Sequence, residues 1–281
     1  MLEFHLFRLK VHFPSQADAF EEPTPARSRL VWDVVESRPA AELRKGYEWH
    51  IGNVRKVDSG AVYFALGRIT KTSVPLFDPD RKDFQRVEFD QAPYTHVVAD
   101  VASEVVAIAR NSRLSPSVPG IARQLAKLMR ESDPAVKLRC HFEVLPIRDP
   151  EDFIEYIRRA WAVTRFKMAF GRPNPIDVEQ LFHAPMERLL EESNGDRGAT
   201  VVRGEALNQD LVEDLARSAA ASGTSASASV RPAKGAAVRR RSLSDSSLTF
   251  GHEEPLTEPL REAWIERMRE LDRRVRGNRG S

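Results

Sequence analysis

Residues 227–243, SASVRPAKGAAVRRRSL, carry five basic side chains and no acidic one. Arginine presents a planar fork of N–H donors that matches a phosphate group, and lysine adds a compact positive charge. On a strand, Arg239 and Arg241 would share one face about 7 Å apart, which roughly matches the spacing of successive phosphates along a nucleic-acid strand. The stretch therefore predicts contact with a polyanion. Its basic residues, the ribbon cluster, are Arg231, Lys234, Arg239, Arg240 and Arg241.

Two further groups of basic residues lie earlier in the chain. The first recurs at i, i+4 and i+7 on a helix predicted over 118–131, opposite its apolar stripe. This helix cluster consists of Arg123, Lys127 and Arg130. The second spans a predicted helix and strand around 158–172. This middle cluster consists of Arg158, Arg159, Arg165, Lys167 and Arg172.

The distribution of charge matters more than its total. The chain has 43 basic and 41 acidic residues, a formal net charge of +2, so a global basic excess is excluded. The acidic residues gather at 131–133, 149–152, 187–196 and 205–214. One basic cluster alone is usually a solvated surface, but three clusters set apart from the acids create a local positive potential. Because no helix-turn-helix and no aromatic-rich RNA-binding signature occurs, we expect contact with the nucleic-acid backbone and little sequence preference.

Catalytic chemistry has one weaker candidate. Pro79-Asp80-Arg81-Lys82 combines P-D and D-x-K, pieces of a nuclease signature in which two carboxylates hold a divalent ion and a lysine steadies the attacking water. The pieces overlap in one turn, whereas such sites need them at separate places on a sheet. A metal-dependent nuclease using Asp80 and Lys82 therefore stays a minor alternative. Without H-E-x-x-H, C-x-x-C or glycine-rich phosphate motifs, no catalytic residue, metal or cofactor is expected.

Two other short motifs contain residues that could carry chemistry. Cys140 and His141 are adjacent, so on a strand they point to opposite faces and cannot form a nucleophile–base pair. The stretch RRRSLSDS resembles a basophilic kinase site at Ser242, or a nuclear localisation patch. The kinase site and the localisation patch are minor alternatives to the polyanion interpretation.

Both strands and helices are predicted in the part of the chain that carries these basic clusters. Alternating patterns predict strands over 2–13, 47–57, 61–69, 83–91, 94–101 and 104–110, with hairpin turns at Asp58-Ser59-Gly60 and Ala102-Ser103. The period then changes, predicting helices over 118–131 and 151–161 and strands over 136–147 and 162–170. The order indicates an α+β fold, a mostly antiparallel sheet with helices packed on it.

The tail has two possible interpretations. Residues 218–229, SAAASGTSASAS, are small and polar, which is typical of a flexible linker. Alternatively a helix over 208–222 ends at Gly223, and a two-stranded ribbon follows that turns at Lys234-Gly235. Pro232 would confine its strand to an edge or a bulge. The ribbon would place the basic side chains on an ordered surface.

A C-terminal amphipathic helix is predicted over 257–276, capped by Thr257 and ended by Gly277. Its narrow apolar seam predicts either pairing of two copies as a homodimer, docking on the core, or binding to a partner protein through 257–276. We expect a core domain over 1–185, helices and the basic ribbon or linker over 186–250, and this helix over 251–281. The seam includes Leu260, Trp264, Met268, Leu271 and Val275.

The amino-acid composition limits the kind of protein and the cellular compartment that can be expected. The chain has 281 residues, 41% of them hydrophobic, which is enough for a substantial core. A single cysteine excludes an intramolecular disulfide and fits a reducing cytoplasm. The N-terminus lacks the basic-then-apolar order of a signal peptide, and no run approaches 18 apolar residues, so no membrane span is expected.

The layout resembles the RexA-type DNA-binding proteins of phage exclusion. The segments that carry the resemblance are an early hairpin, GYEWHIGNVRKVDSGAVYFALGRI, the strands VKLRCHFEV and VTRFKMAF, the helix NQDLVEDLARSAA, the ribbon ASASVRPAKGAAVRRRSL and the terminal amphipathic helix. The resemblance covers most of the chain through its order of elements, without a diagnostic motif. It implies a DNA-binding, dimeric component of anti-phage defence.

The sequence therefore predicts a non-enzymatic DNA-binding protein that contacts the phosphate backbone. Two alternatives remain open. In one, the protein is an interaction adaptor whose arginines only keep its surface soluble. In the other, it is the nuclease with Asp80 and Lys82 described above.

Overall fold

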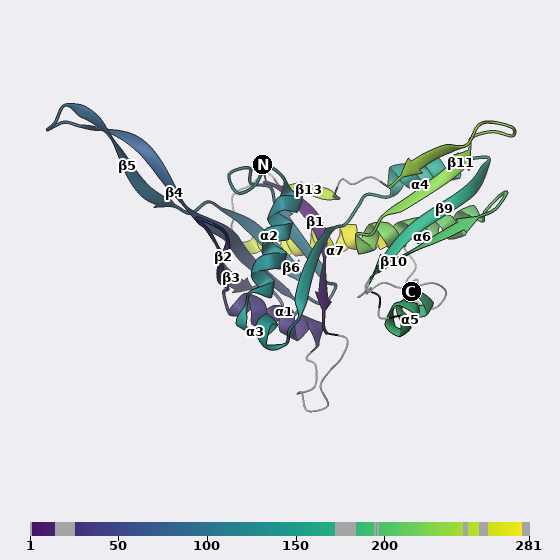
Figure 1. The fold of residues 1–281 in the computed structure, drawn as a ribbon, viewed down its shortest axis with the longest axis horizontal. Coiled ribbons are helices and arrows are strands. Elements are labelled where there is room, and N and C mark those ends of the chain that lie inside the picture. Colours follow the sequence, from purple (N-terminus) through teal and green to yellow (C-terminus); the bar gives the residue numbers. More distant parts are fainter. Residues whose placement is uncertain are drawn as a thin grey trace.

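The computed structural model describes residues 2–14, 26–171, 184–193, 195, 197–243, 247–252 and 258–276. Two antiparallel sheets, of nine and four strands, and seven helices make up this part of the chain (Figure 1). The α+β class predicted from the sequence is confirmed, and the C-terminal helix packs against the rest of the fold.

The larger sheet has the strand order β13-β1-β7-β6-β4-β3-β2, with β8 also paired to β1 and β5 paired to β4. Strand β1, which pairs with β13, β8 and β7, is buried over most of its length, because helices pack on both faces of the sheet. The strands are β1 (Leu2–His12), β2 (Ala40–Arg44), β3 (Tyr47–Lys56), β4 (Ala61–Asp78), β5 (Asp83–Gln91), β6 (Tyr94–Asp100), β7 (Val105–Ala109), β8 (His141–Pro146) and β13 (Thr249–His252).

Three helices cover one face of this sheet, namely α1 (Arg27–Glu36), α2 (Val118–Arg130) and α3 (Asp133–Lys137). The predicted helix over 118–131 is confirmed, and the hydroxyl of Ser117 caps it by accepting a hydrogen bond from the amide of Gly120 at 3.3 Å. The strand predicted over 136–147 is wrong at its start. Pro134 lies in the first turn of α3, and the strand begins only at His141.

The smaller sheet has the strand order β10-β9-β11-β12. Its strands are β9 (Ala162–Gly171), β10 (Arg197–Arg203), β11 (Ala226–Arg231) and β12 (Arg239–Ser242). Helices α4 (Glu151–Arg158) and α6 (Gln209–Ser222) pack on one face, where Phe166, Met168 and Ala228 are buried. Helix α5 (Ala184–Glu192) lies beside β9 and β10 and contributes the buried Leu190.

The linker interpretation of residues 218–229 is wrong. These residues form the end of α6 and the start of β11, and Ala219, Ala220 and Ala221 are fully buried. Small side chains are needed here because α6 ends against the larger sheet. A Cβ added to Gly223, which has φ +73°, would lie 2.7 Å from the Cβ of Leu145. The ribbon interpretation is confirmed by β11 and β12, which turn through Gly235 at φ +79°.

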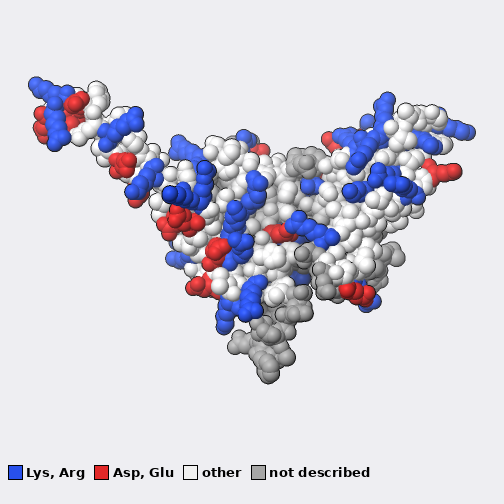
Figure 2. Space-filling view, viewed as in Figure 1, with Lys and Arg blue, Asp and Glu red and all other residues white. Residues whose placement is uncertain are grey.

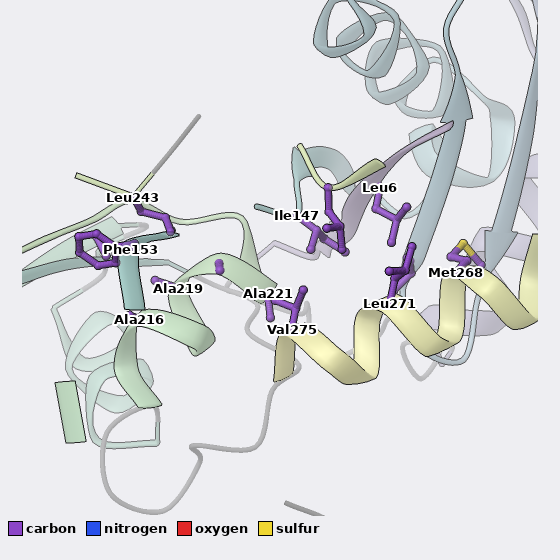
Figure 3. Packing of buried hydrophobic residues seen from close by; sticks show 14 of the residues in the cluster. Leu6, Ile147, Phe153, Ala216, Ala219, Ala221, Leu243, Met268, Leu271 and Val275 are labelled. Carbon is purple, nitrogen blue, oxygen red and sulfur yellow. The ribbon is translucent and has the colours of Figure 1, made fainter. Parts of the chain in front are cut away.

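The C-terminal helix α7 (Glu258–Arg276) docks on the core of its own chain. Trp264, Met268, Leu271 and Val275 are buried, and Figure 3 shows α7 approaching both the α6 end and the β1 region. These four seam residues are therefore occupied within the molecule and do not face outward, while the side chain of Leu260 lies outside the described part of the structure. A partner protein would have to use the outer side of this helix. The predicted cap Thr257 and end Gly277 lie outside the described residues.

Ion pairs fix α7 in this position. The guanidinium of Arg8, fully buried on β1, lies 2.5 Å from a carboxylate oxygen of Asp272, and its Nε donates to the carbonyl of Ala221 on α6 at 3.0 Å. Arg269 bonds Asp100 at 2.8 Å and Asp58 at 3.0 Å, and these carboxylates raise the pKa of the guanidinium further above its usual value. Strand β1 and helices α6 and α7 thus meet at one buried cation, Arg8.

The ranges 1–185 and 186–250 share the smaller sheet, since β9 belongs to the first and β10, β11 and β12 to the second. Strand β13 pairs with β1 across the same range boundaries. The hydrophobic cluster that includes Phe4, Phe166 and Trp264 also runs through all three predicted ranges. The described chain therefore packs as a continuous structure across residues 185 and 250.

Candidate nucleic-acid interface

The smaller sheet has an unusual composition. Its four strands contain eight basic residues and no acidic one. Because the face under α4 and α6 is filled with apolar side chains, the other face must carry much of the charge. Figure 2 shows Lys and Arg side chains gathered over the region of β9 and β11, with few Asp and Glu among them. The basic strand residues are Arg165, Lys167, Arg197, Arg203, Arg231, Arg239, Arg240 and Arg241.

Strand register shows which side chains share the outer face. Arg203 pairs with Arg165, Arg165 with Ser229, and Ser229 with Arg240, so one row crosses all four strands. Four strands about 4.8 Å apart make this row roughly 14 Å wide. Two residues along, the next row contains Val201, Lys167, Ser227 and Ser242. We call this surface, centred on the cations Arg165, Lys167, Arg203 and Arg240, the open basic face.

The cations of the open basic face are available for a ligand. Lys167, Arg203 and Arg240 are exposed, and Arg165 is half-buried. Within the described part of the chain, no carboxylate forms an ion pair with any of these four. The Nε of Arg165 is shielded and makes no hydrogen bond to described atoms, while Arg240 donates to Ser227 Oγ at 3.3 Å. Small neighbours, chiefly serines, leave the guanidinium groups accessible to phosphate oxygens.

The predicted ribbon cluster divides between two faces. Arg240 belongs to the open basic face, whereas its neighbours Arg239 and Arg241 point toward the helix side of the sheet. The guanidinium of Arg241 lies 5.6 Å from the ring centre of Tyr156 on α4 and 3.9 Å from Asp152. The phenol of Tyr156 donates to the carbonyl of Arg239 at 3.0 Å. Arg239 and Arg241 thus share a face, as predicted, but it is the face toward α4.

The two other ribbon cations lie near the end of the hairpin. Arg231 is the last residue of β11 and is half-buried, and strand alternation places it on the side of Ser229. Lys234 is exposed in the turn. Pro232 follows the end of β11, so it removes no hydrogen bond from the ladder.

The helical part of the middle cluster is neutralised. Arg158 makes two hydrogen bonds to Glu213, at 2.6 and 2.7 Å, and these raise the pKa of its guanidinium. Arg159 pairs with Glu155 one turn earlier on α4. Both arginines therefore form ion pairs with glutamates of their own chain. Of this cluster, only Arg165 and Lys167 lie on the open basic face. Arg172 lies outside the described residues.

The helix cluster is elsewhere in the fold. Arg123, Lys127 and Arg130 are exposed on α2, but α2 packs on the larger sheet and not on the smaller one. Arg130 also pairs with Glu131 at 3.0 Å. The three predicted clusters therefore do not form one surface. The middle and ribbon clusters meet in part, because β9 and β11 are neighbours.

Two cations of the smaller sheet were missed from the sequence, Arg197 and Arg203 on β10. Residues 198–206 were not predicted as a strand, although RGATVVR has the β-branched content of one. Only pairing with β9 places Arg203 beside Arg165. Arg197 is paired with Glu143 of β8 and so is partly neutralised.

The nuclease alternative has little structural support. Asp80 and Lys82 occupy the exposed turn between β4 and β5, where Lys82 has φ +53°. Among the described residues, no group of three or more His, Cys, Asp and Glu side chains is arranged to hold a metal ion. Cys140 is buried, which raises the pKa of its thiol, and His141 stacks on His12 at 4.4 Å.

No helix among the described residues is long and apolar enough to cross a membrane. Comparison with protein-family models and with curated protein sequences finds no match to this chain. The geometry and charge of the open basic face are therefore the features of this protein that point to a function.

Proposed function

We propose that this protein binds double-stranded DNA through the open basic face, contacting the phosphate backbone without reading the base sequence. The observation that carries the proposal is the sheet of four strands with eight basic residues and no acidic one. Arg165, Arg203 and Arg240 come from three different strands, so the fold gathers them from distant parts of the sequence. Phosphate binding is the chemistry that best fits unpaired arginines spaced across a flat surface.

The shape of the site favours a duplex over a single strand. Binding of single-stranded nucleic acid usually relies on aromatic side chains that stack with the bases. The outer-face positions of the four strands hold Ala199, Val201, Ser227, Ser229 and Ser242 beside the cations, and no aromatic residue. Bases would find no stacking platform there, whereas the backbone of a duplex would find donors. The described residues of this face also include no helix that could enter a groove and read bases, so little sequence preference is expected.

DNA is preferred over RNA in this proposal because the layout resembles the RexA-type proteins of phage exclusion. The same resemblance places the protein in anti-phage defence. A cytoplasmic location belongs to the proposal as well, and the single buried cysteine, Cys140, is consistent with it.

The test compares two adjacent arginines. Arg240→Glu and Arg241→Glu change the same charge on the same strand, but only Arg240 lies on the open basic face. Fluorescence anisotropy with labelled duplexes of two unrelated sequences measures the affinity at low salt. We expect Arg240→Glu to weaken binding to both duplexes alike, by about tenfold more than Arg241→Glu.

Two results would reject the proposal. One is no detectable binding of the wild-type chain to a duplex at 50 mM salt, and the other is equal loss in both variants. Single-stranded DNA and duplex RNA of the same length serve as competitors, and a clear preference for either would reassign the ligand. Plasmid incubated with Mg²⁺ or Mn²⁺ tests the nuclease alternative in the same preparation.

A further inference from the structure

An exposed serine hydroxyl lies at the edge of the open basic face. Ser242 is the last residue of β12, an edge strand that pairs only with β11 among the described strands. Its side chain makes no hydrogen bond within the described part of the chain. The hydroxyl group is therefore accessible to a modifying enzyme while the core of the protein stays closed.

The residues before Ser242 match the charge pattern that a basophilic protein kinase selects. Such kinases recognise serines by the positive charges that precede them in the sequence. Arg239 and Arg240 stand three and two residues before Ser242, and no other serine or threonine of the chain has basic residues at both positions. Both arginines are exposed, and within the described residues neither forms an ion pair. The motif is thus accessible on the folded protein.

Two cations of the open basic face lie near the Ser242 hydroxyl. The strand register pairs Ser242 with Ser227, and Ser227 with Lys167 on β9. Arg240 shares this face and lies about 7 Å away along the strand. Its guanidinium already points toward the partner of Ser242, because it donates to Ser227 Oγ at 3.3 Å. Since directly paired side chains have Cβ atoms about 5 Å apart, a phosphate on Ser242 would lie within reach of that guanidinium.

We infer that a basophilic protein kinase phosphorylates Ser242 and that the phosphate closes the open basic face to DNA. The inference rests on the proposed DNA function, since it describes regulation of the same surface. In the reaction, the Ser242 oxygen attacks the γ-phosphorus of ATP, the bond from that phosphorus to the bridging oxygen breaks, and ADP leaves. A base of the kinase takes the hydroxyl proton.

The phosphate acts on DNA binding through its charge. It adds about −1.5 to −2 elementary charges and three acceptor oxygens at pH 7. These oxygens accept charge-assisted hydrogen bonds from Arg240, and the negative charge offsets that of Lys167. Two of the four cations of the open basic face are then engaged by the phosphate of the protein itself. Loss of two contacts with DNA should reduce the steepness of the salt dependence by about 1.8.

The first experiment tests the modification. The full chain is incubated with ATP and the catalytic subunit of cyclic-AMP-dependent protein kinase, a basophilic enzyme, and the products are mapped by peptide mass spectrometry. We expect a phosphoryl group on Ser242 of the wild type. The control Ser244→Ala removes a serine that has an arginine three residues before it but not two, and it should still be modified at Ser242. A wild type that stays unmodified at Ser242 overturns the inference.

The second experiment measures the affinity for a labelled duplex by fluorescence anisotropy at 50 mM salt. The phosphorylated wild type should bind about tenfold more weakly than the unmodified protein, and Ser242→Glu about threefold more weakly. Ser73→Glu makes the same substitution at an exposed position of β4 in the larger sheet and should bind as the wild type does. Equal losses in the two glutamate variants overturn the inference.

The switch and the proposed DNA function fail in different ways. If the unmodified wild type binds no duplex, the DNA proposal is rejected and the switch is rejected with it. If the unmodified protein binds and phosphate on Ser242 leaves the affinity unchanged, the DNA proposal stands and only the switch is wrong.

Discussion

Six cations lie on the outer side of the smaller sheet, and one of them, Arg197, is paired with Glu143. Replacing Arg165, Lys167 and Arg203 with glutamine removes three of the other five and leaves Arg231 and Arg240. Each phosphate contact contributes about −0.9 to the slope of log affinity against log salt concentration, because binding releases a condensed counterion. Five contacts give a slope of about −4.5, and two give about −1.8. The variant should therefore bind DNA more weakly at low salt and respond far less to added salt.

These slopes translate into large differences in affinity. Between 50 and 200 mM salt, the wild type should lose roughly 500-fold in affinity and the triple variant only about 12-fold. Anisotropy titrations with one labelled duplex at four salt concentrations would measure both slopes. The binding of the variant at the lowest salt also shows directly how much affinity the three side chains supply.

A matched control separates location from net charge. The control variant replaces three basic residues of α2 by glutamine, namely Arg123, Lys127 and Arg130. It loses the same number of positive charges, but from a helix that packs on the larger sheet. We expect the slope of this variant to stay near −4.5. If both triple variants lower the slope equally, the protein attracts DNA through diffuse charge, and the assignment to the open basic face is wrong. An unchanged slope in the first variant would refute it as well.

Two predictions concern stability. Asp272→Ala leaves Arg8 buried without its carboxylate and should lower the free energy of unfolding, measured by urea denaturation, by about 3–5 kcal/mol. The control Arg267→Ala, on the exposed side of α7, should change it by less than about 1 kcal/mol. Similar losses in the two variants would refute the anchoring role of Arg8. The hydrogen bond from His12 and nearby positive charges lower the pKa of Glu143 to about 2, below its ordinary 4.5, so this carboxylate stabilises the fold above pH 4.5 and the contribution is lost as pH falls toward 2. Glu143→Gln should therefore remove part of the acid-induced decline in melting temperature between pH 4.5 and 2, and an unchanged decline would contradict the assigned interaction.

The elements of this protein follow closely from local sequence patterns. The first strand, the hairpin at Asp58-Ser59-Gly60 and the helix capped by Ser117 are confirmed because each depends on alternation, a turn motif or a cap within a few residues. The helix α1 was not predicted. The strand β10 was also left unassigned, since its seven residues carry a weak pattern that becomes a strand only by pairing with β9.

The site could be predicted only in part. Arg165, Lys167 and Arg240 were named from the sequence, and they do share one face. Arg239 was placed correctly on a strand but on the wrong side for a ligand, because alternation within a strand cannot show which side faces the helices. Arg158 was named for its charge, yet it pairs with Glu213, which is 55 residues away along the chain. Pairings between distant segments leave no trace in a local pattern.

By itself, the sequence determined many of the strands and helices, the local clustering of basic residues and the separation of those clusters from the acids. These properties depend on spacing along the chain, where side chains alternate on a strand or recur along a helix. Only the tertiary structure decided that Arg203 joins Arg165 and Arg240, that Arg158 is neutralised, and that the seam of α7 is used inside the molecule. The physical reason is that strand pairing and helix burial bring together residues that are far apart in the sequence. An arginine is available to bind phosphate only where it is not already in an ion pair with a carboxylate of the protein.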